Sequence, residues 1–112
     1  PTSTGVHSGT IDVNYNNGAS AQVAQRGVQG VGATAALLSV SDGPTYNFGT
    51  QTIGLSAEKT FTVSNSGGVS ATSVSGGGLA SPFFYKGGTY PGTGGNCSST
   101  LAGGSHCTIV VV

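Results

Sequence analysis

The 112-residue sequence contains no methionine, no tryptophan and only six formally charged side chains. Its net charge at pH 7 is zero, so no electrostatic attraction draws it toward nucleic acid or anionic membranes. No apolar run approaches the length of about 18 residues that suggests a membrane-spanning helix. We therefore expect neither nucleic-acid binding nor membrane insertion. With so little charge, little repulsion opposes close association between copies.

The sequence also lacks the residue clusters that catalysis and cofactor binding require. It has three carboxylates and two histidines, and no histidine has an acidic neighbour in the sequence, so neither a catalytic triad nor a carboxylate pair is indicated. The glycines at 27–32 precede no helix and are more simply explained as strand-end glycines than as a nucleotide loop. We expect a protein that is not an enzyme and that has no cofactor and no metal site.

Strand-like alternation is the main positive signal. Residues 9–15 place Ile11, Val13 and Tyr15 on one face of a strand and polar residues on the other. Asn17-Gly18 supplies the positive φ angles of a hairpin turn, and a second strand is expected over about 22–32. No segment has a sustained helical period, and the many glycines disfavour helices.

Further strands are expected along the rest of the chain. The clearest internal one covers residues 58–65, with Phe61 and Val63 facing inward. Shorter ones are expected at 37–40, 46–53, 69–74, 83–85 and 106–112. Short strands separated by regular turn signals predict an all-β fold, an antiparallel β-sandwich of about seven strands.

The last strand, Cys107–Val112, is the most apolar run and has no polar residue after it. We predict that some of its partners lie in another copy. Cys97 and Cys107 have the spacing of a strand-to-strand disulfide, which suits an exported protein. The alternative is two buried thiols. The sequence has no initiator methionine and no signal peptide, and we expect it to be part of a longer protein.

Several segments together resemble the bacterial immunoglobulin-like repeats called choice-of-anchor D, which are related to the abnormal-spindle/hydin (ASH) type. The resemblance rests on Leu38-Ser39-Val40, Tyr46–Thr50, Thr60–Gly67, Phe83, and Cys97 with Leu101–Val111. The family's closing elements occur here at the front of the chain, as Pro1–Gly5, Gly9–Val13 and Val28–Gly32. The resemblance therefore implies an Ig-like repeat in permuted order.

The joint between the two parts supports this division. A strand of six to ten residues spans roughly 20–33 Å, whereas the four residues 33–36 reach at most about 14 Å. In such a sandwich they are too short to connect the last strand back to the first. We expect residues 1–35 to supply the last two strands of one repeat and residues 36–112 the first five strands of the next. The alternative is a circular permutant that closes on itself.

The leading hypothesis is a structural repeat of an extracellular bacterial fibre, stalk or sheath, built end to end from copies that exchange strands. The core is expected to contain Ile11, Val13, Phe61, Val63, Ile109 and Val111. The strand contacts between copies are expected at Ile11, Val13, Tyr15, Val28, Val31, Ile109, Val110, Val111 and Val112. The alternative is an adhesin that binds glycan or a surface protein through the 76–106 loops. Tyr85 and Tyr90 are the candidate ligand or subunit contacts there.

Overall fold

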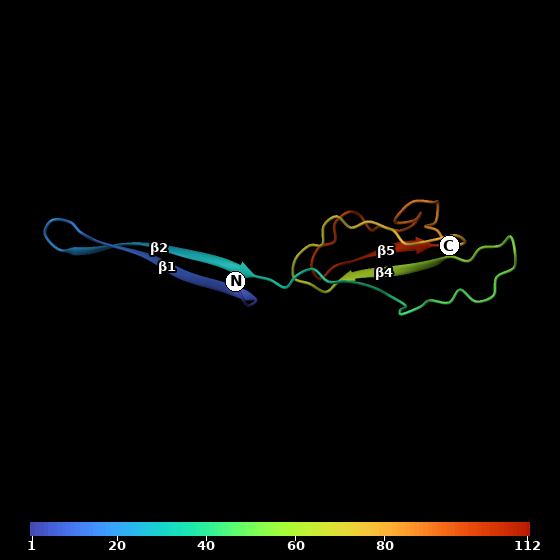
Figure 1. Cartoon of the computed structure of the whole chain (residues 1–112), viewed down its shortest axis with the longest axis horizontal. Coiled ribbons are helices and arrows are strands. Elements are labelled where there is room, and N and C mark those ends of the chain that lie inside the picture. The colour runs from blue at the N-terminus through green and yellow to red at the C-terminus, as the bar shows by residue number, and fades with distance from the viewer. The chain divides into compact units, whose positions relative to one another are not determined.

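A computed structural model describes all residues, 1–112, and the chain divides into two compact units, Pro1–Thr34 and Ala35–Val112 (Figure 1). The fold is all-β, as predicted, and every strand pairing is antiparallel. The structure has no helix of the length and apolarity needed to cross a membrane. The division falls inside the joint of small residues at 33–36.

The first unit is one long hairpin. Strand β1 (Gly5–Asn16) pairs with β2 (Ala21–Gly32) over their full length, from Gly5 opposite Gly32 to Asn16 opposite Ala21. The connecting turn is held by the Asn17 side chain, whose Oδ1 accepts hydrogen bonds from the amides of Ala19 and Ser20. Gly18 takes the positive φ of 95° that the sequence predicted for this turn.

This hairpin buries almost nothing. Of its strand residues, all except Gln22 and Gly32 are exposed. Ile11 and Val13, which were expected in the core, are 52% and 57% exposed. The single chain leaves them uncovered, because a two-stranded sheet has no second layer of its own to cover either face.

The second unit contains a three-stranded sheet of order β3-β4-β5, with β3 at Leu38–Val40, β4 at Lys59–Asn65 and β5 at His106–Val111. Val40 lies opposite Val63, Val63 opposite Cys107 and Phe61 opposite Ile109. Directly opposed residues share a face, so these apolar side chains lie on one side of the sheet. The other side is rich in hydroxyls: Ser39, Thr60, Thr62, Ser64 and Thr108.

The core lies on the apolar face, at one end of the sheet. Val63 and Cys107 from the sheet pack with Cys97 and Leu101 from the loops, and all four are buried. An antiparallel bridge between Ala71 and Leu101 brings the two loop segments together. The second layer of this unit is therefore built from loops rather than from a second sheet.

The buried side chain of Asn65 connects these loops to the sheet. It is 2% exposed, and its Oδ1 accepts hydrogen bonds from the amides of Leu37 (3.1 Å) and Gly67 (3.0 Å). Its Nδ2 donates to the carbonyls of Val69 (2.9 Å) and Leu101 (3.0 Å). One side chain thus joins three separate segments to the end of β4.

Three predicted strands are absent from the structure or reduced to single bridges. Residues 46–53 form no strand, and positive φ angles at Gly49 and Gly54 turn the chain there. The strands expected at 69–74 and 83–85 are reduced to single bridges, Ala71 with Leu101 and Tyr85 with Val111. The structure therefore has five strands in two small sheets.

The terminal strand β5 already has partners in its own unit. Phe84 and Val112 exchange two main-chain hydrogen bonds of 3.0 Å, and Val110 bonds to Lys86 and Pro91. Val110 and Val111 are only 4% and 5% exposed. The prediction that this strand is bare and needs partners from another copy is therefore wrong for its edge, because residues 84–97 cover that edge.

Replacing Asn65 with alanine is expected to lower the free energy of unfolding by about 2–4 kcal/mol, because buried groups left without a partner cost about 1–3 kcal/mol each. Asn65→Asp keeps the two acceptor interactions but places a buried carboxylate oxygen against the carbonyls of Val69 and Leu101, so its loss is expected to be at least as large near pH 7. Asn14→Ala, on an exposed position of β1, is the control and should change stability by less than about 0.5 kcal/mol. Urea denaturation followed by circular dichroism measures all three, and equal stability of Asn65→Ala and Asn14→Ala would contradict the role assigned to Asn65.

Alanine substitutions at Gly88 and Gly92 distinguish the cost of backbone strain from the cost of a steric clash. Both have positive φ, +91° and +88°, but a Cβ at Gly92 would meet the main chain of Val110, whereas Gly88 has nothing within 4 Å. Gly88→Ala is expected to lose about 1–2 kcal/mol through its left-handed conformation. Gly92→Ala should lose a further 1–3 kcal/mol or so because β5 must move away. Thermal or urea unfolding of both variants compares them, and the same loss in each would show that the loop does not press on β5.

Candidate functional site: an open groove and an uncovered hairpin

The second unit has an open groove of about 610 Å³ beside its small core. Phe61, Ile109 and Val111 of the apolar sheet face line it, together with Val40 from β3. Its other side chains come from two loops that flank this face, and they include Tyr46, Phe48, Leu79, Phe83 and Tyr85. The groove is thus the part of the apolar face that the loops leave uncovered.

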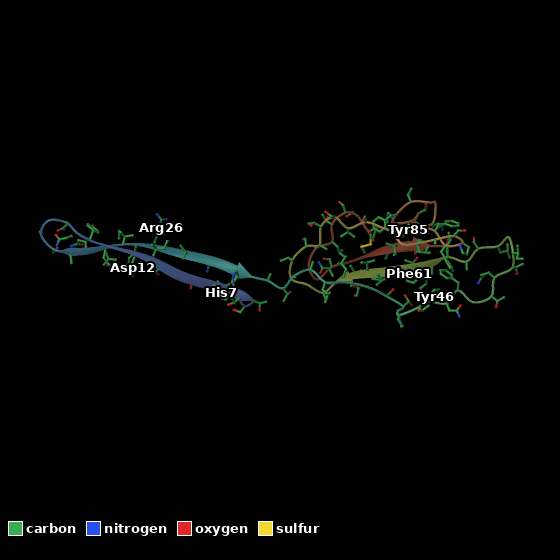
Figure 2. All side chains as sticks on the ribbon, viewed as in Figure 1. His7, Asp12, Arg26, Tyr46, Phe61 and Tyr85 are labelled. Carbon is green, nitrogen blue, oxygen red and sulfur yellow. A yellow bond between two sulfur atoms is a disulfide. The ribbon has the colours of Figure 1, made fainter.

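A chain of aromatic rings runs along the groove. The ring of Tyr46 meets those of Phe61 and Phe48 edge to face, with centroids 5.5 and 5.0 Å apart. Phe48 in turn lies 5.6 Å from Phe83. Figure 2 shows Tyr46, Phe61 and Tyr85 around the strands of this unit. Aromatic pairs in these geometries stabilise one another, so the groove has a preformed apolar lining.

The charges near the groove are paired with each other. The Lys59 ammonium lies 3.1 Å from a carboxylate oxygen of Asp42 and 4.7 Å from the centre of the Tyr46 ring. Hydrogen bonds from the Ser41 hydroxyl and from Lys59 lower the pKa of Asp42. Lys86 pairs with Glu58. Because each of these charges is matched, the groove favours an apolar occupant over an ionic one.

Tyr85 and Tyr90 are both half-buried and contact each other edge to face, with ring centroids 5.6 Å apart. Tyr85 lines the groove, whereas Tyr90 packs against the core cluster. Gly76 lies directly against both rings, and a Cβ there would come within 2.6 Å of the Tyr85 hydroxyl. The two tyrosines were predicted together as ligand or subunit contacts, but they lie in different surroundings.

The second feature is the apolar face of the hairpin. The register places Ile11 opposite Arg26, Val13 opposite Ala24 and Tyr15 opposite Gln22, with Val28 opposite Gly9. These residues share one face, and its large apolar side chains are Ile11, Val13, Tyr15 and Val28, all about half exposed. The opposite face carries Asp12, whose Oδ1 accepts a 2.9 Å hydrogen bond from Gln25. Figure 2 shows Asp12 and Arg26 on opposite sides of the ribbon, as this register requires.

Val31 does not belong to the same face as the other predicted hairpin contacts. It lies opposite Val6, on the side of Asp12, and both valines are exposed. Of the predicted contacts in the last strand, Ile109 and Val111 line the groove, but Val110 points to the other side of the sheet. The alternation of a strand explains both differences, because a one-residue step changes the face.

The predicted disulfide between Cys97 and Cys107 is present, with Cα atoms 4.9 Å apart. Both residues are buried in the core cluster. Next to it, the Asn96 side chain accepts a hydrogen bond of 2.7 Å from the amide of Thr108. The disulfide thus fixes the long loop to β5, close to the closed end of the apolar face.

No family model, curated protein or solved structure matches this chain. The site therefore has to be interpreted from its own geometry. Sequence reasoning found the apolar hairpin face but missed the groove walls, in particular Tyr46, Phe48 and Leu79. The clusters of aromatic residues at 46–48 and 83–85 were the only sequence signal for these walls. They could not be assigned to one groove, because the sequence pattern does not specify the path of the loops that carry them.

Tyr90 provides a pH-dependent probe of the packing against the core cluster. Burial raises the pKa of Tyr90, and the neighbouring Tyr85 adds to this effect. Below pH of about 10 the phenol is neutral in both the folded and unfolded chain, so its contribution to stability is fully present. That contribution is lost as the pH rises through the raised pKa of the folded state.

We expect the tyrosinate absorbance of Tyr90 to appear at higher pH in the folded chain than in the unfolded chain, and the free energy of unfolding to fall more above pH 10 in wild type than in Tyr90→Phe. Tyr15→Phe, at an exposed position of β1, is the matched control for the loss of one hydroxyl. A normal titration of Tyr90 in the folded chain would contradict its burial against the core cluster.

Proposed function

We propose that this chain is a structural repeat of an extracellular bacterial fibre, stalk or sheath, in which Ig-like β-sandwiches are completed between neighbouring copies. The observation that carries the proposal is that one chain has two apolar surfaces that nothing covers. One is a hairpin with an uncovered apolar face. The other is a sheet whose apolar face is left open as a groove.

Each surface is unfavourable when left in water. A two-stranded hairpin is marginally stable at best unless a further layer covers it. The four large apolar side chains on its face would each contribute up to about 1.5–3 kcal/mol on full burial, and about half of that is still available here. Assembly through these side chains would therefore stabilise the hairpin and close the core at the same time.

The number of strands supports an Ig-like sandwich shared between copies. β3, β4 and β5 form one sheet, and the bridged segments at Ala71 and Tyr85 lie where two further short strands would run. The two strands of the hairpin would bring the total to seven. This corresponds to the choice-of-anchor D and ASH type that the sequence resembles.

An intrachain disulfide is compatible with an extracellular location, where such bonds persist. The net charge of zero also favours dense assembly, because it provides little repulsion between copies. An adhesin role through residues 76–106 was the other hypothesis. Its two candidate tyrosines already cover part of each other's surface, so the geometry favours assembly.

The proposal is tested by the solution mass of the chain in its native order and of a permuted chain in which residues 35–112 precede residues 1–34. The native order is expected to give a ladder of oligomers in size-exclusion chromatography with light scattering. The permuted chain places the hairpin directly after Val112, so that it can complete the sheet that precedes it. It is expected to be a monomer that unfolds cooperatively.

A native-order chain that is monomeric at all concentrations, with hairpin amides protected from hydrogen exchange, would overturn the proposal in favour of a chain that closes on itself. Reductant should not convert oligomers to monomers, because the only two cysteines already pair within one chain.

A further inference from the structure

The two faces of the hairpin differ, and only one of them matches the groove. The Ile11 face carries four large apolar side chains and a single charge, Arg26. The Asp12 face has Val6 and Val31 at one end and Val23 near the other, and it carries serine, threonine, asparagine and glutamine at most positions between them. An apolar groove with matched charges at its rim would leave those polar groups without partners. The Ile11 face is therefore the one that the groove can accept.

Both surfaces present apolar side chains over a short stretch of strand. The apolar side chains of β1 lie between Ile11 and Tyr15, a stretch of about 14 Å. On the acceptor, Phe61 lines the groove from β4, and Ile109 and Val111 line it from β5. The hairpin as a whole is much longer, so its tip and its open end would extend past the groove.

The contact area reaches that of a specific interface only if main-chain contacts add to the two apolar surfaces. Each of the four half-exposed apolar residues presents roughly 100 Å², so the face offers roughly 400 Å². A matching area from the groove gives roughly 800 Å² in total, and specific interfaces begin near 1,000 Å². Main-chain contacts at the outer edge of β3, which has no strand on that side, would supply the remainder.

We propose, building on the assembly function above, that the groove of one copy binds the hairpin of the next copy through the face of Ile11, Val13, Tyr15 and Val28. These side chains pack against Phe61, Phe83 and Ile109 of the acceptor. Each copy then has one donor surface and one acceptor surface, and the two are different. Such a heterologous contact extends into a polar, head-to-tail chain unless reciprocal exchange between two copies or a ring closes it.

The assignment is tested with two chains, each blocked on one surface. Phe83→Asp places a carboxylate in the groove and leaves the hairpin intact, whereas Val13→Asp places one on the hairpin face and leaves the groove intact. Each variant alone is expected to be monomeric in light scattering. An equimolar mixture should give a single species of twice the mass of the 10.8 kDa chain and no larger oligomers, because one intact hairpin meets one intact groove.

Matched controls lie one residue away. Phe84 is about as exposed as Phe83 but does not line the groove, and Asn14 lies next to Val13 on the opposite face. Phe84→Asp and Asn14→Asp should each assemble as wild type does. Circular dichroism checks that all four variants fold, and Val40→Asp and Tyr15→Asp replace the blocking variants if either of them is unfolded.

The outcomes separate the inference from the function on which it rests. Hydrogen exchange in the mixture should protect the β1–β2 amides of the Phe83→Asp chain and leave those of the Val13→Asp chain unprotected. Oligomers in wild type without a dimer in the mixture would overturn the assignment of surfaces and leave assembly intact. Oligomers of Phe83→Asp alone would show that hairpins bind each other instead. A monomeric wild type would overturn both proposals.

Discussion

The structure depends on one constraint: a β-sheet must cover its apolar face, and neither sheet of this chain does so alone. The hairpin has two strands and no second layer, so Ile11 and Val13 remain exposed. The three-stranded sheet has loops over one end of its apolar face and a groove over the other. A covered core thus requires surface from outside each unit, and this requirement connects the fold with the proposed assembly.

Within the second unit, polar contacts and a covalent bond hold the loops where a second sheet would otherwise lie. Asn65 joins residues 37, 67, 69 and 101 to the end of β4, and the disulfide joins Cys97 to β5. Both lie at the closed end of the apolar face. At the open end, the Lys59–Asp42 ion pair joins one loop to β4, and aromatic contacts such as Phe48 with Phe83 line the groove.

Local patterns in the sequence predicted the elements that depend on near neighbours. The alternation of Ile11, Val13 and Tyr15 and the Asn-Gly turn predicted the hairpin, and the alternation around Phe61 and Val63 predicted the central strand. The same patterns failed where partners are distant. Asn65 was expected as the end of the 58–65 strand, but it is the most buried side chain, and residues 46–53 were expected as a strand although they form none and contribute Tyr46 and Phe48 to a groove wall.

The all-β class and the hairpin with its turn could be predicted from the sequence, and the cysteine spacing favoured a disulfide. Each follows from residue spacing or backbone preference over a short range. Contacts across the fold were needed to show that residues 84–97 cover the edge of β5, that Val31 lies on the opposite hairpin face from Val28, and that the apolar face ends in a groove. Strand register and loop path set these features, and both depend on contacts between residues far apart in the chain.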